Sequence, residues 1–307
     1  MTQLLRFLRL IFVDWLPALI DVCRRLYRWK KREPRDPSRV YCHPIDRPAF
    51  VRPEPTIYDQ YWLTKLGLAV TWDNPDIQLY RAGVPVSSTG LEPGVTYDVT
   101  ARVWNNSHHA PVVDLPVRFS YLEFGIGTVS NPIGVAILKT LGVKGGANHP
   151  AFVTMPWTTP TTPGHYCLQV KLEPVDDLNP DNNRGQENTD VAVAQSPAVF
   201  EFKLENRTPG NRRYRFEVDA YRLDTVSPCT DRREDRLARH RRGLHTVPAG
   251  WQVKLDPETP SLAAGASVGT TVTVTPPTGW TGTQPLNVNA FNEASFAGGV
   301  TLLVKSS

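Results

Sequence analysis

Residues 91–107 read LEPGVTYDVTARVWNNS, and this stretch decides the fold class. Pro93-Gly94 is a turn signal, and the apolar residues after it alternate with polar ones. The alternating apolar residues are Tyr97, Val99, Ala101 and Val103. A period of two indicates an extended strand with one buried face.

Segments of the same kind lie on both sides of this stretch. In the first half of the chain they are at 76–83, 111–124, 163–174 and, after a turn-rich loop at 176–188, at 189–194. In the second half they are at 198–208, 212–223, 250–257, 267–277, 285–293 and 298–306. Short antiparallel strands at this spacing predict a mainly β protein built from two tandem sandwiches.

The composition agrees with strands and excludes two other classes. The 307 residues include 28 prolines, or about 9% against the usual ~5%. Proline interrupts helices and central strands, so a helical bundle is excluded. No apolar run reaches the ~18–20 residues that a membrane-spanning helix needs, so a multipass membrane protein is excluded as well.

The first half of the chain resembles a known family. The segments PDIQLY (75–80), LEPGVTYDVTARVWNNS and PGHYCLQVKLEPVDDLNPDNN (163–183) resemble the bacterial cell-adhesion-related Ig-like module over about residues 72–195. The resemblance implies an Ig-like sandwich in a bacterial protein. The chain departs from the family pattern at 125–150.

The second half resembles another family. The run PAGWQVKLDPETPSLAAGASVGTTVTVTPPTGW (248–280) is similar to the Ig-like domain attached to bacterial glycosidases and surface proteins, here over about 198–305. The resemblance implies an Ig-like fold and makes Trp251 a core residue rather than a ligand platform. It does not settle the function.

Basic charge is concentrated before this β body. Residues 1–52 hold 12 Lys or Arg against five Asp or Glu, and the remaining 22 basic and 25 acidic residues leave the body mildly acidic. Within 4–32, LLRFLRLIFVDWLPALIDVCRRLYRWKKR, most charges fall on one arc of a helical wheel and the apolar residues fill the other. The pattern predicts an amphipathic, basic helical arm over 1–32.

This arm supplies the candidate site. We expect it either to lie in the interface of an anionic membrane or to dock in a groove on a partner or on its own fold. The candidate binding residues are Leu8, Phe12, Trp15, Leu16, Leu19, Arg24, Arg25 and Arg28. Asp14, Pro17 and Asp21 interrupt its apolar centre and no cleavage site follows, so neither a signal peptide nor a membrane span is expected.

Four domains follow from these patterns. They are the arm at 1–32, a proline-rich linker at 33–71, a first Ig-like sandwich at 72–197 with an insertion at 125–150, and a second at 198–307 with an Arg-rich insertion at 224–247. The first insertion is expected to form a short helix or hairpin that contacts a partner or covers the core. The second is expected to be a solvated or partner-facing loop, and nucleic-acid binding is not expected.

Catalytic motifs are missing from the sequence. Phosphate-binding loops, metalloprotease and hydrolase motifs are absent. His108-His109 is expected in a surface turn, and the Asp/Asn loop at 176–183 is expected to be a turn, with calcium as the alternative. The cysteines at 23, 42, 167 and 229 lack zinc spacing and are expected to be reduced, although a Cys23–Cys42 bridge stays open. No enzyme activity, cofactor or metal is therefore predicted.

The sequence favours a structural or interaction protein of a bacterial assembly. Its predicted partners are other protein subunits, in self- or hetero-assembly, and an anionic membrane surface through the arm. The predicted location is cytoplasmic or peripheral to a membrane rather than secreted. The alternative is a cell-surface adhesion or carbohydrate-binding module.

Overall fold

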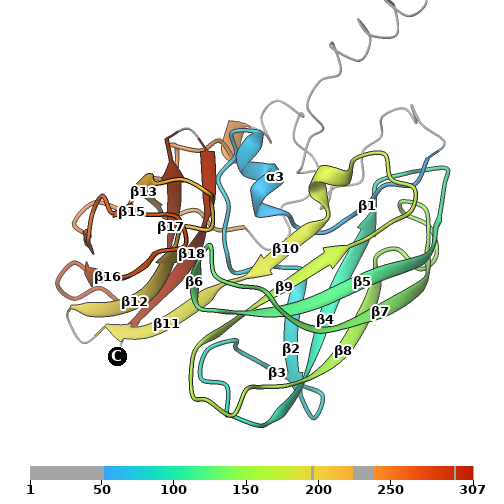
Figure 1. Ribbon diagram of the computed structural model, residues 1–307, viewed down its shortest axis with the longest axis horizontal. Coiled ribbons are helices and arrows are strands. Elements are labelled where there is room, and N and C mark those ends of the chain that lie inside the picture. The colour runs from blue at the N-terminus through green and yellow to red at the C-terminus, as the bar shows by residue number, and fades with distance from the viewer. Residues whose placement is uncertain (1–51, 195–196, 224–237, 294, 307) are drawn as a thin grey trace, which may run out of the picture. The chain divides into compact units, whose positions relative to one another are not determined.

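The computed structural model describes residues 52–194, 197–223, 238–293 and 295–306, all of which belong to one compact unit, 37–307. This part of the chain is mainly β, as predicted, and its strands form four sheets (Figure 1). The sheets face each other in two sets, which we call the first and the second sheet pair. In the described ranges no helix is long and apolar enough to cross a membrane.

The first sheet pair is built from the first half of the chain. In one sheet β4 (Thr96–Asn105) pairs with β1 (Pro55–Thr56), β2 (Ile77–Arg81) and β8 (Ala151–Thr158), and β3 (Val84–Val86) pairs with β2. The other sheet has the order β10 (Arg184–Glu187), β9 (Tyr166–Leu172), β5 (Val112–Glu123) and β7 (Asn131–Leu141). All these pairs are antiparallel.

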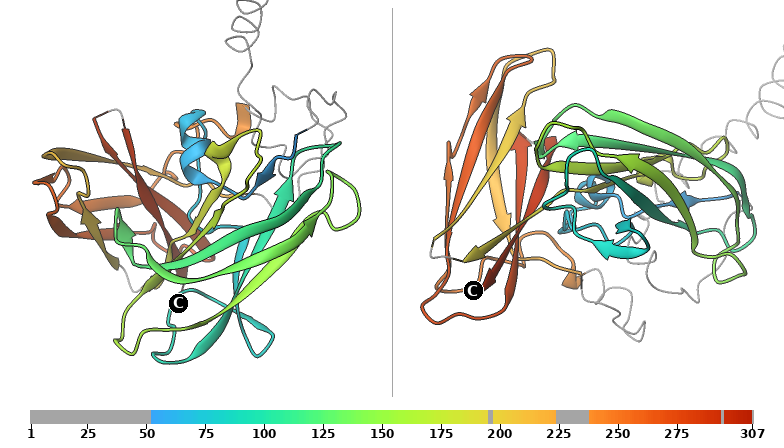
Figure 2. Two further views of the ribbon diagram at one scale, coloured as in Figure 1. Left: turned by 45° about the vertical axis from the view of Figure 1, so that its right-hand side comes forward. Right: turned by 90° about the horizontal axis from the view of Figure 1, so that it is seen from below.

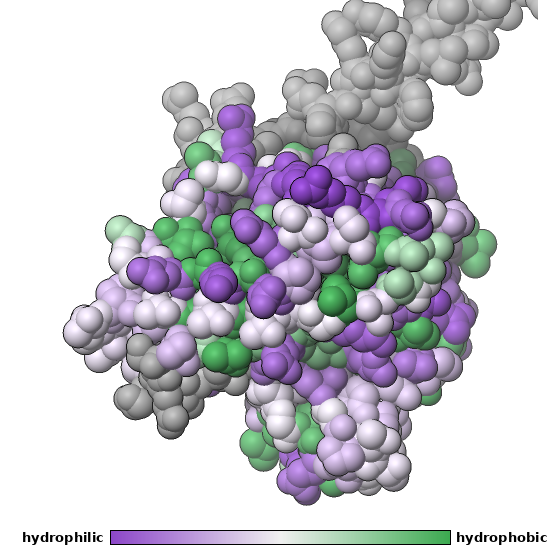
Figure 3. Space-filling model, turned by 60° about the vertical axis from the view of Figure 1, so that its left-hand side comes forward, coloured by the Kyte–Doolittle hydropathy of each residue, from purple (hydrophilic) through white to green (hydrophobic). Residues whose placement is uncertain are grey.

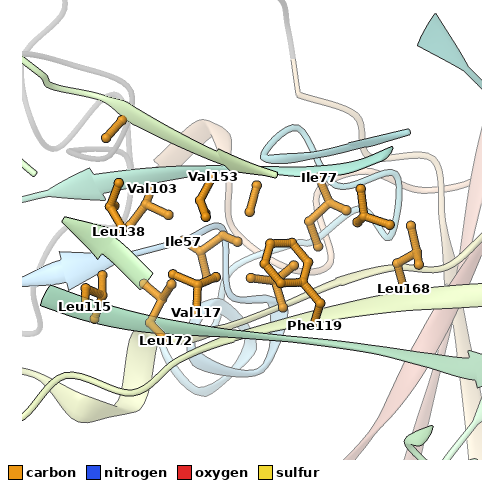
Figure 4. Close-up of a cluster of buried hydrophobic side chains, with 14 of the residues drawn as sticks. Ile57, Ile77, Val103, Leu115, Val117, Phe119, Leu138, Val153, Leu168 and Leu172 are labelled. Carbon is orange, nitrogen blue, oxygen red and sulfur yellow. The ribbon is translucent and has the colours of Figure 1, made fainter. Parts of the chain in front are cut away.

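The core of the first sheet pair follows from the alternation in the sequence. The four apolar residues of β4 that alternate with polar ones are all buried. They face buried residues of β5 and β9, among them Val117, Phe119 and Leu168 (Figure 4). The period of two thus identified the inward face of the central strand correctly.

The second sheet pair uses mostly the second half of the chain. One sheet has the order β11 (Thr189–Ala194), β18 (Ser295–Ser306), β17 (Thr283–Asn292), β13 (Arg212–Asp219) and β15 (Ser261–Leu262). The other has β14 (Gln252–Asp256), β16 (Ser267–Thr275), β12 (Ala198–Glu205) and β6 (Gly125–Ile126). Apart from the green β6, its strands run from yellow to red in Figure 2. Phe200, Leu204 and Leu302 belong to its buried core.

Two short strands connect the sheet pairs. The strand at 189–194, which the sequence analysis assigned to the first module, pairs as β11 in parallel with β18 of the second. β6 leaves the end of β5 and pairs in parallel with β12. Alternation in a sequence shows which face of a strand is buried but does not name its neighbour, so these two pairings could not be predicted.

The segment 125–150 also differs from the prediction of a short helix or hairpin insertion. Its residues 131–141 form β7, an 11-residue strand that pairs with β5 in the sheet of β10, β9, β5 and β7. The β-branched residues Ile133, Val135 and Ile137 favour an extended backbone.

The predicted linker at 33–71 is also folded over its described part. Residues 52–71 contain β1 and the helix α3 (Gln60–Lys65), and Ile57, Tyr58 and Val70 are buried. Asp59 caps the helix because its Oδ1 accepts a hydrogen bond from the Trp62 amide at 2.9 Å. Proline content alone did not reveal these buried residues.

Candidate functional site

The residues predicted to bind a partner or membrane lie outside the described residues. This holds for Leu8, Phe12, Trp15, Leu16, Leu19, Arg24, Arg25 and Arg28. The amphipathic helix and its target therefore stay predictions. Positions 224–237 of the Arg-rich insertion also lie outside the described ranges.

The Asp/Asn loop uses its carboxylates for contacts within the protein. The Asp176 carboxylate accepts a hydrogen bond from Arg52 Nε at 2.7 Å. The two carboxylate oxygens of Asp177 accept hydrogen bonds from the Asn179 amide at 2.9 Å and from Asn183 Nδ2 at 2.6 Å. Part of the loop is the 3-10 helix η3 (Pro180–Asn182). Across the described ranges, no group of three or more His, Cys, Asp or Glu is arranged to hold a metal ion.

The histidine pair lies in the bend that follows β4. The Ser107 hydroxyl oxygen accepts hydrogen bonds from the amides of His109 at 3.3 Å and Ala110 at 3.1 Å. The Asn105 side chain donates to the Ala110 carbonyl at 2.8 Å. These contacts give the bend a structural basis.

Trp72 is the centre of the contact between the two sheet pairs, which we call the joint. Its side chain is 0% exposed. Its indole Nε1 donates to Asn289 Oδ1 at 3.0 Å, and its backbone amide donates to Thr301 Oγ1 at 2.7 Å. Tyr61 and Phe296 pack on the ring with centroid distances of 5.7 and 5.9 Å. One residue thus brings apolar burial and two hydrogen bonds to the joint.

A closed ring of hydrogen bonds surrounds Trp72. Thr301 Oγ1 donates to Asn287 Oδ1 at 2.7 Å, and Asn287 Nδ2 donates to Asp219 Oδ1 at 2.7 Å. The second oxygen of Asp219 accepts from Asn289 Nδ2 at 3.2 Å, which leads back to the indole. Burial raises the pKa of Asp219, and its hydrogen bonds to Asn287 and to a backbone amide oppose that rise. A satisfied buried network of this kind fixes one arrangement of the groups that form it.

Asn188 closes the joint from the other side. Its Nδ2 donates to the carbonyls of Gly125 at 2.9 Å and Gly299 at 2.6 Å, and its Oδ1 accepts from the Cys167 thiol. Cys167 is buried and free, as predicted. A Cβ atom on Gly299 would lie 2.3 Å from Trp72 Nε1, so only glycine allows this close approach.

Besides Asp219, two acidic residues lie at the joint. Glu187 is buried, and its carboxylate accepts hydrogen bonds from the Asn74 amide at 2.6 Å and from Ser88 Oγ at 3.2 Å. Burial, and after it the charge of Asp73, raises the pKa of Glu187 to about 8. Burial raises the pKa of Asp73 as well. At neutral pH the Glu187 carboxyl therefore holds its proton, which removes the cost of burying its negative charge next to the more exposed Asp73.

A second feature lies in the second sheet pair, where a four-residue motif occurs twice. Pro248-Ala-Gly-Trp251 and Pro277-Thr-Gly-Trp280 each form a turn, in which the Trp amide donates to the Pro carbonyl at 3.2 and 3.1 Å. The glycines have φ of +84° and +75°, as a turn with a left-handed third residue requires. We call the two turns together the tryptophan corner.

The two turns lie against each other. Trp251 precedes β14 and Trp280 follows β16, and the register Gln252↔Thr275 places both turns at the same end of this strand pair. The two indole rings meet edge to face with centroids 4.8 Å apart. Both rings pack on the second core but keep part of their surface exposed. The resemblance predicted Trp251 as a core residue. Its ring does pack on the core, but part of the ring is also exposed to solvent.

Polar side chains neighbour both tryptophans of the corner in the sequence. On the face shown in Figure 3, hydrophobic residues lie in several small patches between hydrophilic ones. The exposed neighbours of the tryptophans in the sequence are Gln252, Thr278 and Thr281, which offer amide and hydroxyl groups. The corner therefore combines aromatic surface with polar side chains.

Sequence comparison finds a family match over this region. Residues 239–291 match the family described as NPCBM-associated, NEW3 domain of alpha-galactosidase. The match spans both turns of the tryptophan corner. No curated protein matches the chain.

Comparison of structures gives only distant similarity. The chain is similar to Salmonella alpha-2-macroglobulin reacted with methylamine, at 10% identity and a TM-score of 0.23 over 70% of this chain and 16% of that one. It is similar to the native conformation of E. coli alpha-2-macroglobulin at 8% identity, with the same TM-score and the same coverage. The chain spans about a sixth of those proteins, and similarity at this TM-score assigns no fold.

The sequence analysis missed Trp280, although the signal was present. The motif Pro-x-Gly-Trp was noted only at Trp251, and its second copy 29 residues later was not used. A repeat of four residues predicts two similar turns but does not show that they meet. The joint left no comparable signal, because its residues are spread from Trp72 to Thr301.

Proposed function

We propose that this chain is a non-catalytic accessory protein built from Ig-like sandwiches, with a carbohydrate-related role in its C-terminal half. The observation that carries the proposal is the match of residues 239–291 to a domain of alpha-galactosidase, within which the tryptophan corner lies. The missing catalytic motifs support the non-catalytic part. The substrate class proposed for the corner is a carbohydrate with an exposed, apolar ring face.

The chemistry of the corner fits such a ligand. A sugar ring presents C–H groups on one face and hydroxyl groups around its rim. The exposed parts of the Trp251 and Trp280 rings, which meet edge to face, offer apolar aromatic surface, while the hydroxyls and amide of Thr278, Thr281 and Gln252 offer hydrogen-bond partners near it. Rings held by two hydrogen-bonded turns need little ordering when a ligand binds.

The test is binding of the full chain to soluble polysaccharides, galactose-containing ones first, by affinity electrophoresis and calorimetry. Trp280→Ala is expected to lower the affinity at least tenfold. Trp62→Ala is the matched control, because Trp62 is a partly exposed tryptophan of α3, and it should stay within about twofold of the unchanged protein. Absence of binding to every carbohydrate tried, or equal effects of both variants, would reject the carbohydrate role.

A second candidate function is that of an interaction protein in a bacterial assembly, with the arm as the element that reaches a partner or membrane. The charge difference between residues 1–52 and the rest of the chain supports it. Replacing Phe12, Trp15 and Leu19 with Ser is expected to abolish recruitment to the target. Co-sedimentation with anionic and neutral vesicles separates the two targets, since equal binding to both would count against recognition of lipid charge.

A further inference from the structure

β7 is a terminal strand of unusual length for this molecule. It pairs with β5 on one side, and no strand of the described residues is hydrogen-bonded to its other side, although Met155 of β8, in the facing sheet, lies against Gly134. It has 11 residues, whereas the other terminal strands of the four sheets have between two and eight. A strand of this length presents a long row of backbone groups for pairing with another chain.

The other terminal strands carry features that discourage such pairing. β3 contains Pro85 and β8 contains Pro156, and proline lacks the amide that a new neighbour would need. β14 carries the charges of Lys254 and Asp256. In β7 such residues lie only toward the ends, at Pro132 and Lys139, and the six residues between them, Ile-Gly-Val-Ala-Ile-Leu, have neither proline nor charge. Natural sheets protect their edges against pairing with other chains, so an unprotected edge indicates that the edge binds another chain.

The side chains of β7 are also apolar where they meet solvent. Val135 and Ile137 are 42% and 46% exposed, on the outer face of the sheet opposite Arg118 and Pro116 of β5. The large hydrophobic residues that are exposed in the described ranges are Val84, Val113, Val129, Val135, Ile137, Phe152, Val175, Val199 and Leu244. Five of these nine lie on β5, β7, β8 or the loop before β7. We call β7 with Val135 and Ile137 the open edge.

We propose that the open edge pairs with the open edge of a second copy of this chain, antiparallel and about a two-fold axis. The sequence of β7 is complementary to itself in the register in which Ala136 faces its own copy. Val135 of each copy then faces Ile137 of the other, so two apolar pairs form on the outer face. A two-fold contact of this kind closes after two copies and covers the β7 edge of both.

Charge placement supports a second copy as the occupant. Lys139 is the one charged residue of β7, and in this register it faces Ile133 and not another lysine. Its ammonium group lies 2.9 Å from Asp114 Oδ1 in its own copy, so it carries its counter-charge with it. The pairing therefore brings no like charges together. This inference is independent of the carbohydrate role, because β7 lies in the first sheet pair and the tryptophan corner in the second.

Sedimentation velocity of the full chain over about 1–100 µM tests the proposal. The unchanged protein is expected to shift from monomer to dimer as its concentration rises. The variant V135K/I137K places lysines opposite each other across the axis and should weaken the dimer at least thirtyfold. V199K is the control, since Val199 is 53% exposed but lies on β12, which has neighbours on both sides. Circular dichroism melts show whether each variant is folded.

A charge-swap variant tests the register. In V135E/I137K each glutamate faces a lysine of the other copy if Val135 faces Ile137, so this variant should dimerise more tightly than V135K/I137K by at least tenfold. A parallel, in-register pairing, in which each residue faces its own copy, would place like charges together in both variants. A monomer at every concentration, a dimer that V135K/I137K leaves intact, or equal behaviour of the two variants would overturn the proposal.

Discussion

The joint buries polar groups, whereas the open edge exposes apolar ones. The joint buries a glutamate, an aspartate and four amide or hydroxyl side chains around Trp72, and each finds partners within the chain. The open edge exposes valine and isoleucine on a strand with one neighbour. The difference shows which surface the chain completes by itself and which it leaves for another molecule.

The comparison also separates stability from association. Residues of the joint hold two sheet pairs in one compact unit, so their loss should lower the free energy of unfolding. Residues of the open edge contact solvent in the single chain, so their replacement should leave that free energy nearly unchanged and affect only association. The four predictions below run from the largest expected effect on stability to the smallest.

Trp72→Ala should destabilise the protein most, by about 3–5 kcal/mol, because it leaves a cavity and removes the indole donor of Asn289. Urea unfolding followed by circular dichroism measures the change. Trp62→Ala, on the partly exposed side of α3, should cost about 1 kcal/mol or less. Equal losses for the two variants would show that the joint is not where the sheet pairs depend on each other.

Glu187→Gln should change how stability depends on pH. Because the pKa of Glu187 is raised from 4.5 to about 8, the folded protein keeps a proton that the unfolded chain has lost between these values. Stability contributed by this proton is therefore fully present below a pH of 4.5 and is lost progressively as the pH rises to about 8, with no further loss above it. Glutamine cannot lose a proton, so Glu187→Gln removes this pH dependence. The difference in unfolding free energy between the two proteins should therefore change by a few kcal/mol between low and high pH. Melting curves from pH 5 to 9 measure it, and parallel curves would contradict the assignment.

Asp59→Ala should cost about 1–2 kcal/mol, because it removes the cap of α3, the helix whose Leu63 packs in the small core beside Trp72. Asp59 also accepts a hydrogen bond from the Arg184 amide at 2.8 Å. Asp59→Asn keeps one acceptor oxygen, so its free energy of unfolding should lie between those of the unchanged protein and Asp59→Ala. Chemical unfolding ranks the three proteins, and a ranking in which Asn is worse than Ala would rule out the cap.

V135K/I137K should change the stability of the single chain by less than about 0.5 kcal/mol, as is usual for exposed positions. The measurement is urea unfolding at about 1 µM, below the concentration at which a dimer is expected. A loss comparable to that of Trp72→Ala would mean that these side chains support the core, which would remove the contrast between the joint and the open edge.

Local patterns predicted the parts of the fold that depend on one strand at a time. The alternation of Tyr97, Val99, Ala101 and Val103 gave the buried face of β4, and the six strands of the second half lie where their patterns placed them. The parallel pairings of β11 and β6 were not predictable, because they depend on which strand ends meet in space.

The candidate site was harder for the same reason. Trp251 was visible in the sequence, but its contact with Trp280 depends on two turns that meet across the β14–β16 pair. Trp72, Asn188 and Thr301 are ordinary residues in sequence, and only the fold brings them together. The insertion at 125–150 was expected to contact a partner or cover the core, but the position of β7 at a sheet edge was not predictable without the pairing to β5.

Hydrogen exchange of the full chain at about 1 µM and 100 µM compares the two regions in one measurement. Amides of Trp72, Asn188 and Thr301, which donate hydrogen bonds within the joint, should be equally protected at both concentrations. Within residues 133–139 of β7, the amides that point away from β5 should gain protection only at the higher concentration, whereas the alternate amides bonded to β5 should be protected at both. V135K/I137K should abolish the gain. Protection of the amides pointing away from β5 that does not depend on concentration, or joint amides that exchange as fast as these at about 1 µM, would contradict the contrast between a joint closed by the chain and an edge left open for a second copy.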